Sequence, residues 1–63
     1  MSFTENFNRL MQERGITRYR VSKDLKVSLQ TACNWASGKS IPDTPSALKL
    51  AEYFGTTVEA LMK

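Results

Sequence analysis

"KVSLQTACNWASGK", the stretch from Lys26 to Lys39, separates apolar and polar residues onto two sides of a helix. At about 100° per residue, Ala32 and Trp35 fall on one side. The opposite side holds three short, uncharged side chains: Gln30, Asn34 and Ser37. Solvent-facing sides of helices usually carry charged residues. The pattern therefore predicts a helix that packs through Ala32 and Trp35 and presents amide groups outward.

The basic residues of the chain gather around this stretch. The 63 residues contain nine Lys and Arg and six Asp and Glu, which gives a net charge of +3. The segment from Arg14 to Lys39 has six basic residues and one acidic residue, Asp24, whereas each flanking segment has one more acidic than basic residue. Such a concentration is typical of a face that binds a polyanion, although a solvated basic surface would show the same count.

Apolar residues recur at helical spacing along the chain, and no segment alternates as a strand does. We expect a first helix that ends before Gly15, a second capped by Thr17, and a third that runs from a Ser28 cap to Gly38. The inward residues of the first two helices are predicted to be Phe3, Phe7, Leu10, Met11, Val21, Ser22 and Leu25.

A fourth helix is expected to open at Asp43 or Thr44, because the following Pro45 is tolerated in a first turn, and to end at Gly55. Its buried row is predicted to be Ala47, Leu50, Ala51 and Phe54.

Thr56 and Glu59 have the spacing of a capping box for a last short helix that carries Val58 and Leu61. The fold class that follows is all-α: a compact bundle of about five short helices that forms a single domain over residues 1–63.

The residues that most enzymes and metal sites need are missing. The chain has no histidine and one cysteine, Cys33, which we expect to be a half-exposed small residue. It contains no glycine-rich phosphate loop. We therefore expect no enzyme activity, no cofactor, no metal and no small-molecule ligand.

No apolar run approaches the length of a membrane span, and the N-terminal residues show no signal-peptide pattern. Together with a lone free thiol, these features predict a protein of the bacterial cytoplasm with no membrane partner.

The second and third predicted helices are joined by the short turn "LKVS", which fits a helix-turn-helix motif. In this motif the second helix enters the major groove of DNA and its N-terminal residues reach the base edges. Amides can bond to adenine, and a Leu side chain or a Thr methyl can meet the thymine methyl. The predicted base-reading residues are Leu29, Gln30, Thr31 and Asn34. Alternatively, Gln30 and Asn34 are simply soluble surface residues.

Basic residues flank this reading helix. Arg18 and Arg20 begin the helix before it, and Lys39 follows its end. All three are placed to neutralise DNA phosphates on either side of a groove.

The segment from Ile16 to Met62 resembles the phage repressor and Cro-type helix-turn-helix family. The matching features, in order, are Thr17, Val27-Ser28, Trp35, Gly38-Lys39, Pro42 and "LKLAEYFGTTVEAL". The resemblance implies base reading by Leu29, Gln30 and Asn34, with Thr31 nearby, and a core role for Trp35. The phosphate-contacting positions that it implies, together with the flanking basic residues, are Thr17, Arg18, Arg20, Ser28, Ser37, Lys39 and Ser40.

Three positions depart from the family pattern. Lys26 stands where glycine is common in the turn, and a left-handed conformation there costs a non-glycine residue roughly 1 kcal/mol. Ala36 replaces a frequent glutamate. Arg18 replaces a glutamine that in the family bonds the first residue of the reading helix, a partner that Leu29 could not supply here.

These observations predict a sequence-specific regulator that binds double-stranded DNA, most simply a small phage or prophage repressor of the Cro type. Family dimers meet near the last helix, where Val58, Leu61 and Met62 are the expected exposed dimer residues. A homodimer would read a partly palindromic operator with half-sites about 34 Å apart, and it could form only on DNA.

Other functions fit the same bundle. An antitoxin or adaptor domain would act through protein contacts and should show an apolar patch on the third helix. A non-specific architectural binder should carry more lysines, and an enzyme's N-terminal domain is a remote third alternative.

Overall fold

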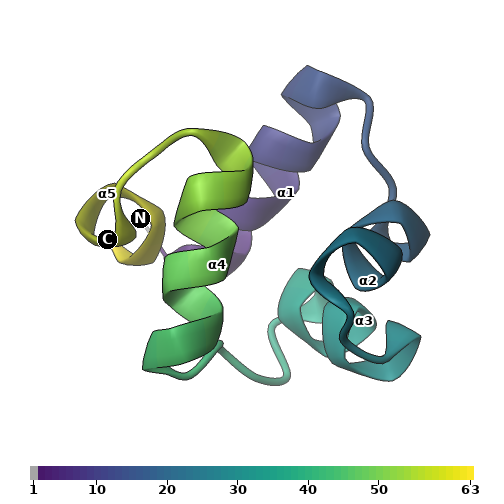
Figure 1. The fold of residues 1–63 in the computed structure, drawn as a ribbon. Helices are drawn as coiled ribbons and strands as arrows, with labels where there is room; N and C mark the ends of the chain where they lie inside the picture. The colour runs from purple at the N-terminus through teal and green to yellow at the C-terminus, as the bar shows by residue number, and fades with distance from the viewer. Residues whose placement is uncertain (1) are drawn as a thin grey trace.

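The computed structural model describes residues 2–63, and Met1 lies outside the described residues. The helices are α1 (Phe3–Arg14), α2 (Arg18–Leu25), α3 (Leu29–Ser37), α4 (Thr44–Phe54) and α5 (Val58–Met62). Between residues 2 and 63 there is no strand. The predicted all-α bundle of five short helices is confirmed. In Figure 1, α2 and α3 form one side of the molecule, and α1, α4 and α5 form the other.

Most helix ends lie where the sequence predicts them. Thr17, Ser28 and Asp43 cap α2, α3 and α4, and each side chain accepts a backbone N–H from the first turn. The N-cap of α1, which the sequence analysis did not name, is Ser2, whose capping box with Glu5 satisfies both backbone donors. Gly15, Gly38 and Gly55 end α1, α3 and α4 in the left-handed conformation.

The predicted capping box of α5 is wrong by one residue. Thr57 caps this helix, and its side chain accepts the N–H of Ala60. Thr56 is unavailable because its backbone N–H donates to the carbonyl of Ala51, at 2.8 Å, and so completes the C-terminal turn of α4. Glu59 is therefore the second residue of α5 and cannot close a box.

Aromatic rings join three helices in the core. Phe7 of α1 is fully buried, and its ring meets Trp35 of α3 and Phe54 of α4 edge-on, with centroids 6.0 and 6.1 Å apart. Phe3 stacks on Phe7 at 5.4 Å. The predicted core residues of α4 are all buried, and so is Trp35, which therefore acts as a packing residue. The core thus holds α3 rigidly against α1 and α4.

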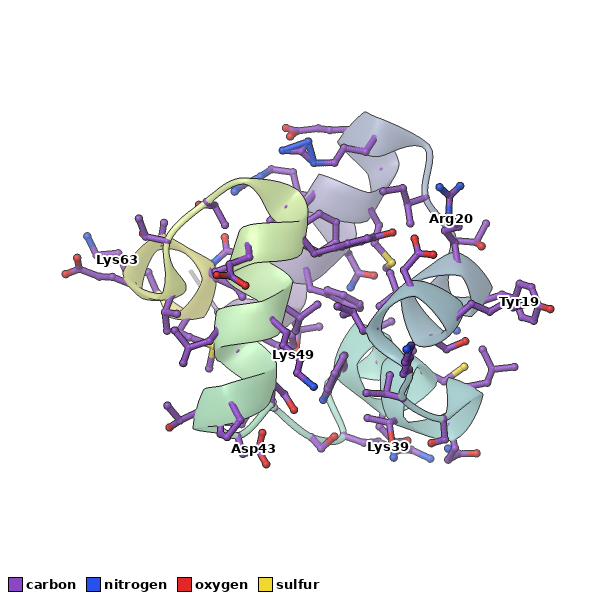
Figure 2. The ribbon with its side chains drawn as sticks, in the orientation of Figure 1. Tyr19, Arg20, Lys39, Asp43, Lys49 and Lys63 are labelled. Carbon is purple, nitrogen blue, oxygen red and sulfur yellow. The ribbon has the colours of Figure 1, made fainter. Side chains whose placement is uncertain are left out.

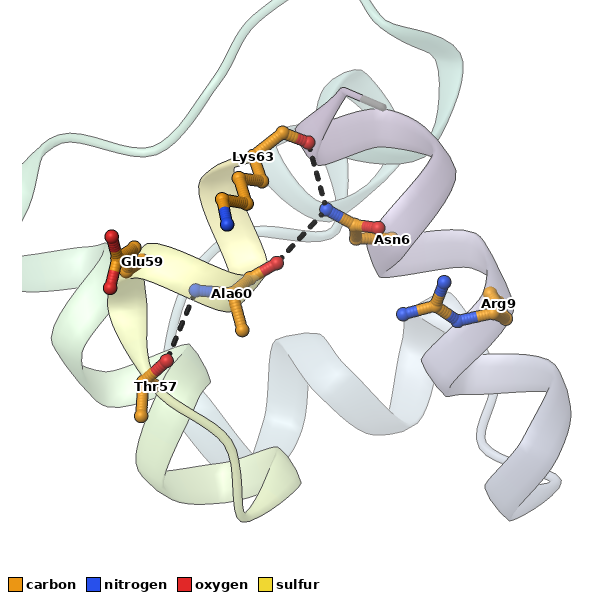
Figure 3. Close-up of a pocket in the computed structure, with 6 residues that line it drawn as sticks. All are labelled: Asn6, Arg9, Thr57, Glu59, Ala60 and Lys63. Atoms are coloured by element: carbon orange, nitrogen blue, oxygen red, sulfur yellow. Dashed lines mark hydrogen bonds between the residues drawn. The ribbon is translucent and has the colours of Figure 1, made fainter.

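The short helix α5 lies on the side of the molecule away from α2. Figure 2 shows Lys63, just after α5, and Tyr19, on α2, at opposite sides of the molecule. Asn6 of α1 is only 3% exposed, and its Nδ2 donates to the carbonyls of Ala60, Leu61 and Lys63 at 2.8–3.2 Å. Figure 3 shows two of these hydrogen bonds at the edge of a shallow hollow.

The docking of α5 corrects one predicted dimer residue. Leu61 is 1% exposed and belongs to the core, because the contact with α1 turns it inward. Val58 and Met62 are half-buried against the same core, so each keeps some exposed surface. Among the described helices, none is long and apolar enough to cross a membrane.

Candidate nucleic-acid interface

The turn between α2 and α3 is tight and left-handed. Lys26 has φ 58° and ψ 41°, and within residues 2–63 it is the only non-glycine residue with a positive φ. The backbone N–H groups of Lys26 and Val27 both donate to the carbonyl of Ser22. This closes α2 and turns the chain so that Ser28 can cap α3 two residues later.

One side of α3 packs into the molecule. Ala32, Trp35 and Ala36 are buried, and the helical spacing of the sequence predicts this for Ala32 and Trp35. Asn8 of α1 donates through Nδ2 to the carbonyl of Ala36 at 2.9 Å, which fixes α3 from the side of α1. The small Ala36 side chain lies against the core, where a glutamate would be unfavourable without a partner.

The other side of α3 is mostly polar and is exposed at its N-terminal end. Leu29 is 48% exposed, Gln30 is exposed, and Asn34 is half-buried. The Nε2 of Gln30 donates to Oδ1 of Asn34 at 3.0 Å, so a hydrogen bond joins the two side-chain amides. Thr31 is half-buried, and its hydroxyl forms a hydrogen bond with the Ser28 hydroxyl, at 2.8 Å.

The C-terminal end of α3 presents small polar groups and one basic residue. The carbonyl of Asn34 accepts the Ser37 hydroxyl at 3.3 Å and the backbone N–H groups of Lys39 and Ser40 at 3.0 and 3.4 Å. Ser37, Lys39 and Ser40 are exposed. The Lys39 side chain lies beside the end of α3 in Figure 2, away from α1.

Arg18 and Arg20 lie in different surroundings although both begin α2. Arg18 lines a hollow with Thr17, Leu29 and Cys33, and among residues 2–63 its guanidinium has no hydrogen-bond or ion-pair partner. Arg20 donates through Nε to Oδ2 of Asp24 at 2.9 Å, one turn along α2. The charge of Arg18 is therefore open to a ligand, whereas that of Arg20 is partly neutralised.

The Asp24 carboxylate also connects α2 to α4. Tyr53 donates its hydroxyl to Oδ2 of Asp24 at 2.6 Å. This hydrogen bond, together with Arg20, holds the pKa of Asp24 below its ordinary value. Burial and the same carboxylate raise the pKa of Tyr53. The sequence analysis missed this pair, because 29 residues separate its members and no local spacing connects them.

Sequence reasoning also left out Tyr19, an exposed aromatic residue on the same hollow as Arg18 and Leu29. The Lys23 ammonium lies 5.4 Å from the centre of its ring. An aromatic residue between two arginines, "RYR", is the signal that could have identified it.

The structure brings the predicted base-reading residues together on α3 and places Thr17, Arg18, Ser28 and Lys39 around them. It separates the predicted dimer residues, which lie on α5 beyond α4. Within residues 2–63, no three His, Cys, Asp or Glu side chains are grouped so that they could hold a metal ion.

A helix-turn-helix family model matches residues 8–61, most of the chain and all of this surface. The chain belongs to the helix-turn-helix family of the lambda repressor and Cro type. The crystal structure of a transcriptional regulator from Listeria innocua is similar, with a TM-score of 0.90 and 31% sequence identity. The match covers 97% of this chain but only 57% of that one. Comparison with curated protein sequences gave no match.

Two departures from the helix-turn-helix family pattern now have a structural account. Lys26 adopts the left-handed turn that glycine usually makes, so the turn keeps the family's shape in spite of the substitution. Arg18 cannot make the side-chain hydrogen bond to the first residue of α3, because that residue is Leu29 and a leucine side chain offers no acceptor.

Proposed function

We propose that this chain is a transcription regulator that binds double-stranded DNA in a sequence-specific manner, most simply as a phage or prophage repressor of the Cro type. The observation that carries the proposal is the exposed, uncharged amide face of α3, flanked by Arg18 and Lys39. Membership in the helix-turn-helix family supports it, as does the regulator from Listeria innocua. The similarity covers only 57% of that regulator, and residues 1–63 are proposed to act as a DNA-binding domain.

In this proposal α3 lies in the major groove. Leu29 and the Gln30 amide meet base edges near the N-terminal end of α3. Thr31 contributes through its methyl group, which can meet a thymine methyl, while its hydroxyl is hydrogen-bonded to that of Ser28.

Phosphate contacts hold the protein in register on either side of the groove. The proposed contacts are Thr17, Arg18, Ser28, Ser37, Lys39 and Ser40. Arg20 is proposed as a weaker contact, since Asp24 already binds its Nε. Lys39 and Arg18 carry most of the sequence-independent affinity, because cations that neutralise phosphates release counterions.

We also propose that two copies bind one operator as a homodimer, in the bacterial cytoplasm. Val58 and Met62 remain the proposed dimer residues on α5. Symmetric dimers fit partly palindromic sites, with half-sites about one helical turn apart.

A protein-interaction module is the second function to weigh. Its best support is a pair of exposed apolar side chains, Ile41 at 65% and Leu48 at 53%. Both lie outside α3: Ile41 precedes α4 and Leu48 is on α4. On α3 itself Leu29 is the one exposed large apolar side chain, and the rest of its outward face is formed by amides and small polar groups, which favours DNA.

Selection of bound sites from a random pool of DNA duplexes tests the proposed function. We expect enrichment of a partly palindromic motif. A protein that enriches no motif, but retains DNA of any sequence, would be a non-specific binder. A protein that retains no DNA would favour the protein-interaction module.

A further inference from the structure

We propose that Asn34 sets the base preference of Gln30, and that the pair selects adenine over guanine at the base pair that Gln30 contacts. The inference rests on the proposed function. It changes the role of Asn34, from a residue that reads a base of its own to a positioning residue for Gln30.

The two side chains are neighbours on one face of α3. They are four residues apart, which places them one helical turn from each other. Nε2 of Gln30 donates to Oδ1 of Asn34 at 3.0 Å. Gln30 is exposed and Asn34 is half-buried, so Gln30 is the member of the pair that extends outward.

Asn34 is the fixed member of the pair. Its backbone carbonyl accepts the N–H groups of Gly38, Lys39 and Ser40 and the Ser37 hydroxyl, which defines its backbone at the end of α3, and the residue is half-buried, whereas Gln30 is exposed. Its side chain has only two rotatable bonds, whereas glutamine has three. The hydrogen bond therefore orients Gln30 on Asn34, and not the reverse.

The hydrogen-bond inventory of the paired Gln30 selects a base. A free glutamine amide has two N–H donors and one carbonyl acceptor. When one N–H is given to Asn34, one donor and one acceptor remain. Adenine presents one acceptor, N7, and one donor, N6–H, in the major groove. Guanine presents two acceptors, N7 and O6. The paired Gln30 therefore matches adenine and lacks the second donor that guanine requires.

Binding to DNA should strengthen the preference of the paired Gln30 for adenine. Water leaves the groove when α3 docks, and a hydrogen bond in a less polar environment is stronger. If Gln30 turned to give both N–H groups to guanine, Oδ1 of Asn34 would lose its partner in a partly dehydrated site. Without Asn34, the same glutamine could meet adenine or guanine with two hydrogen bonds.

The experiment compares the affinities of the wild-type, Asn34→Ala and Asn34→Asp proteins for two duplexes. The duplexes carry A·T or G·C at the one base pair where Gln30→Ala removes the wild-type preference. The wild-type protein is expected to prefer adenine about tenfold, the size of one good bidentate contact. Asn34→Ala should reduce this preference to about threefold or less, because both donors of Gln30 are then free.

Asn34→Asp is the matched control. It keeps an oxygen acceptor for Gln30, so the preference for adenine should remain about tenfold, while affinity for both duplexes falls because the added negative charge repels phosphates. Rescue of the preference without rescue of affinity is a result that a purely structural role of Asn34 cannot produce.

Two results would overturn the inference. In the first, Asn34→Ala keeps the wild-type preference at the base pair of Gln30. In the second, it loses discrimination only at a neighbouring base pair, which would mean that Asn34 reads its own base. A wild-type protein without preference at any position would instead overturn the proposed function, and this inference with it.

Discussion

Lys26 is a residue whose backbone conformation conflicts with its side chain. The left-handed region crowds the Cβ of any residue other than glycine, at a cost of roughly 1–2 kcal/mol. Lys26 occupies that region because two backbone hydrogen bonds to the Ser22 carbonyl define the turn between α2 and α3. The turn is therefore set by hydrogen bonding and helix packing, and the residue at its centre adapts.

Replacement of Lys26 by glycine should stabilise the protein. The relief of about 1–2 kcal/mol exceeds the roughly 0.5–1 kcal/mol of chain entropy that a glycine loses on folding. We expect the free energy of unfolding to rise by about 0.5–1 kcal/mol in urea denaturation. Lys26→Ala keeps the Cβ and removes the charge, so it should unfold close to wild type. Equal stabilisation by both variants would show that charge, and not backbone strain, is the cause.

At the scale of the element, α5 is held by a contact from the other end of the chain. Asn6 of α1 binds the carbonyls of Ala60, Leu61 and Lys63, and it is almost fully buried. A helix of five residues is too short to be stable alone, so this contact and the burial of Leu61 determine its position.

Asn6→Ala should therefore loosen α5. Carbonyls that are buried without a partner destabilise a fold, and we expect a loss of about 1–3 kcal/mol in the free energy of unfolding. Amide hydrogen exchange should accelerate first in α5. Gln12→Ala is the control, because Gln12 is an exposed residue of α1, the helix that carries Asn6. This variant should change the free energy of unfolding by no more than about 0.5 kcal/mol. Equal losses in the two variants would contradict the role of Asn6.

The sequence predicted those elements whose signals are local. Thr17, Ser28 and Gly38 delimit α2 and α3 because a cap acts within three or four residues of the helix it ends. The inward side of α5 could not be predicted, because it depends on Asn6, more than fifty residues away. Leu61 was misplaced for that reason.

The candidate site also has features that the sequence predicts and features that it does not. The helical wheel identified the outward residues of α3, since periodicity alone separates them from Ala32 and Trp35. It could not show that Gln30 donates to Asn34, or that Arg20 is paired with Asp24, because such pairs depend on rotamers and on neighbouring helices.

For the whole molecule, the structure separates basic residues that already have partners from two that lie beside α3 without an acidic partner. The guanidinium of Arg14 donates to the carbonyl of Phe54 and lies over its ring, so it serves the fold. Arg20 is paired with Asp24. Arg18 and Lys39 have no acidic partner among residues 2–63 and lie beside the outward face of α3. Net charge alone does not show which basic residues are available to DNA.

The salt dependence of DNA binding should distinguish a basic residue that is free to contact phosphate from one that is paired within the protein. Lys39→Ala should weaken binding to all sequences and reduce the slope of log affinity against log salt concentration by about one unit. Arg20→Ala, which removes an equal charge already paired with Asp24, should reduce the slope by clearly less. Equal reductions would mean that the ion pair opens on DNA. An unchanged slope in Lys39→Ala would show that Lys39 makes no phosphate contact.

The affinity of Gln30→Ala for the selected site and for random DNA tests the central claim most directly. If the amide face of α3 reads bases, the variant should lose about 1–3 kcal/mol on the selected site, roughly 5- to 150-fold, and almost nothing on random DNA. Its thermal unfolding should match wild type, because Gln30 is exposed. An equal loss on both DNAs, or no loss on the selected site, would contradict base reading by α3.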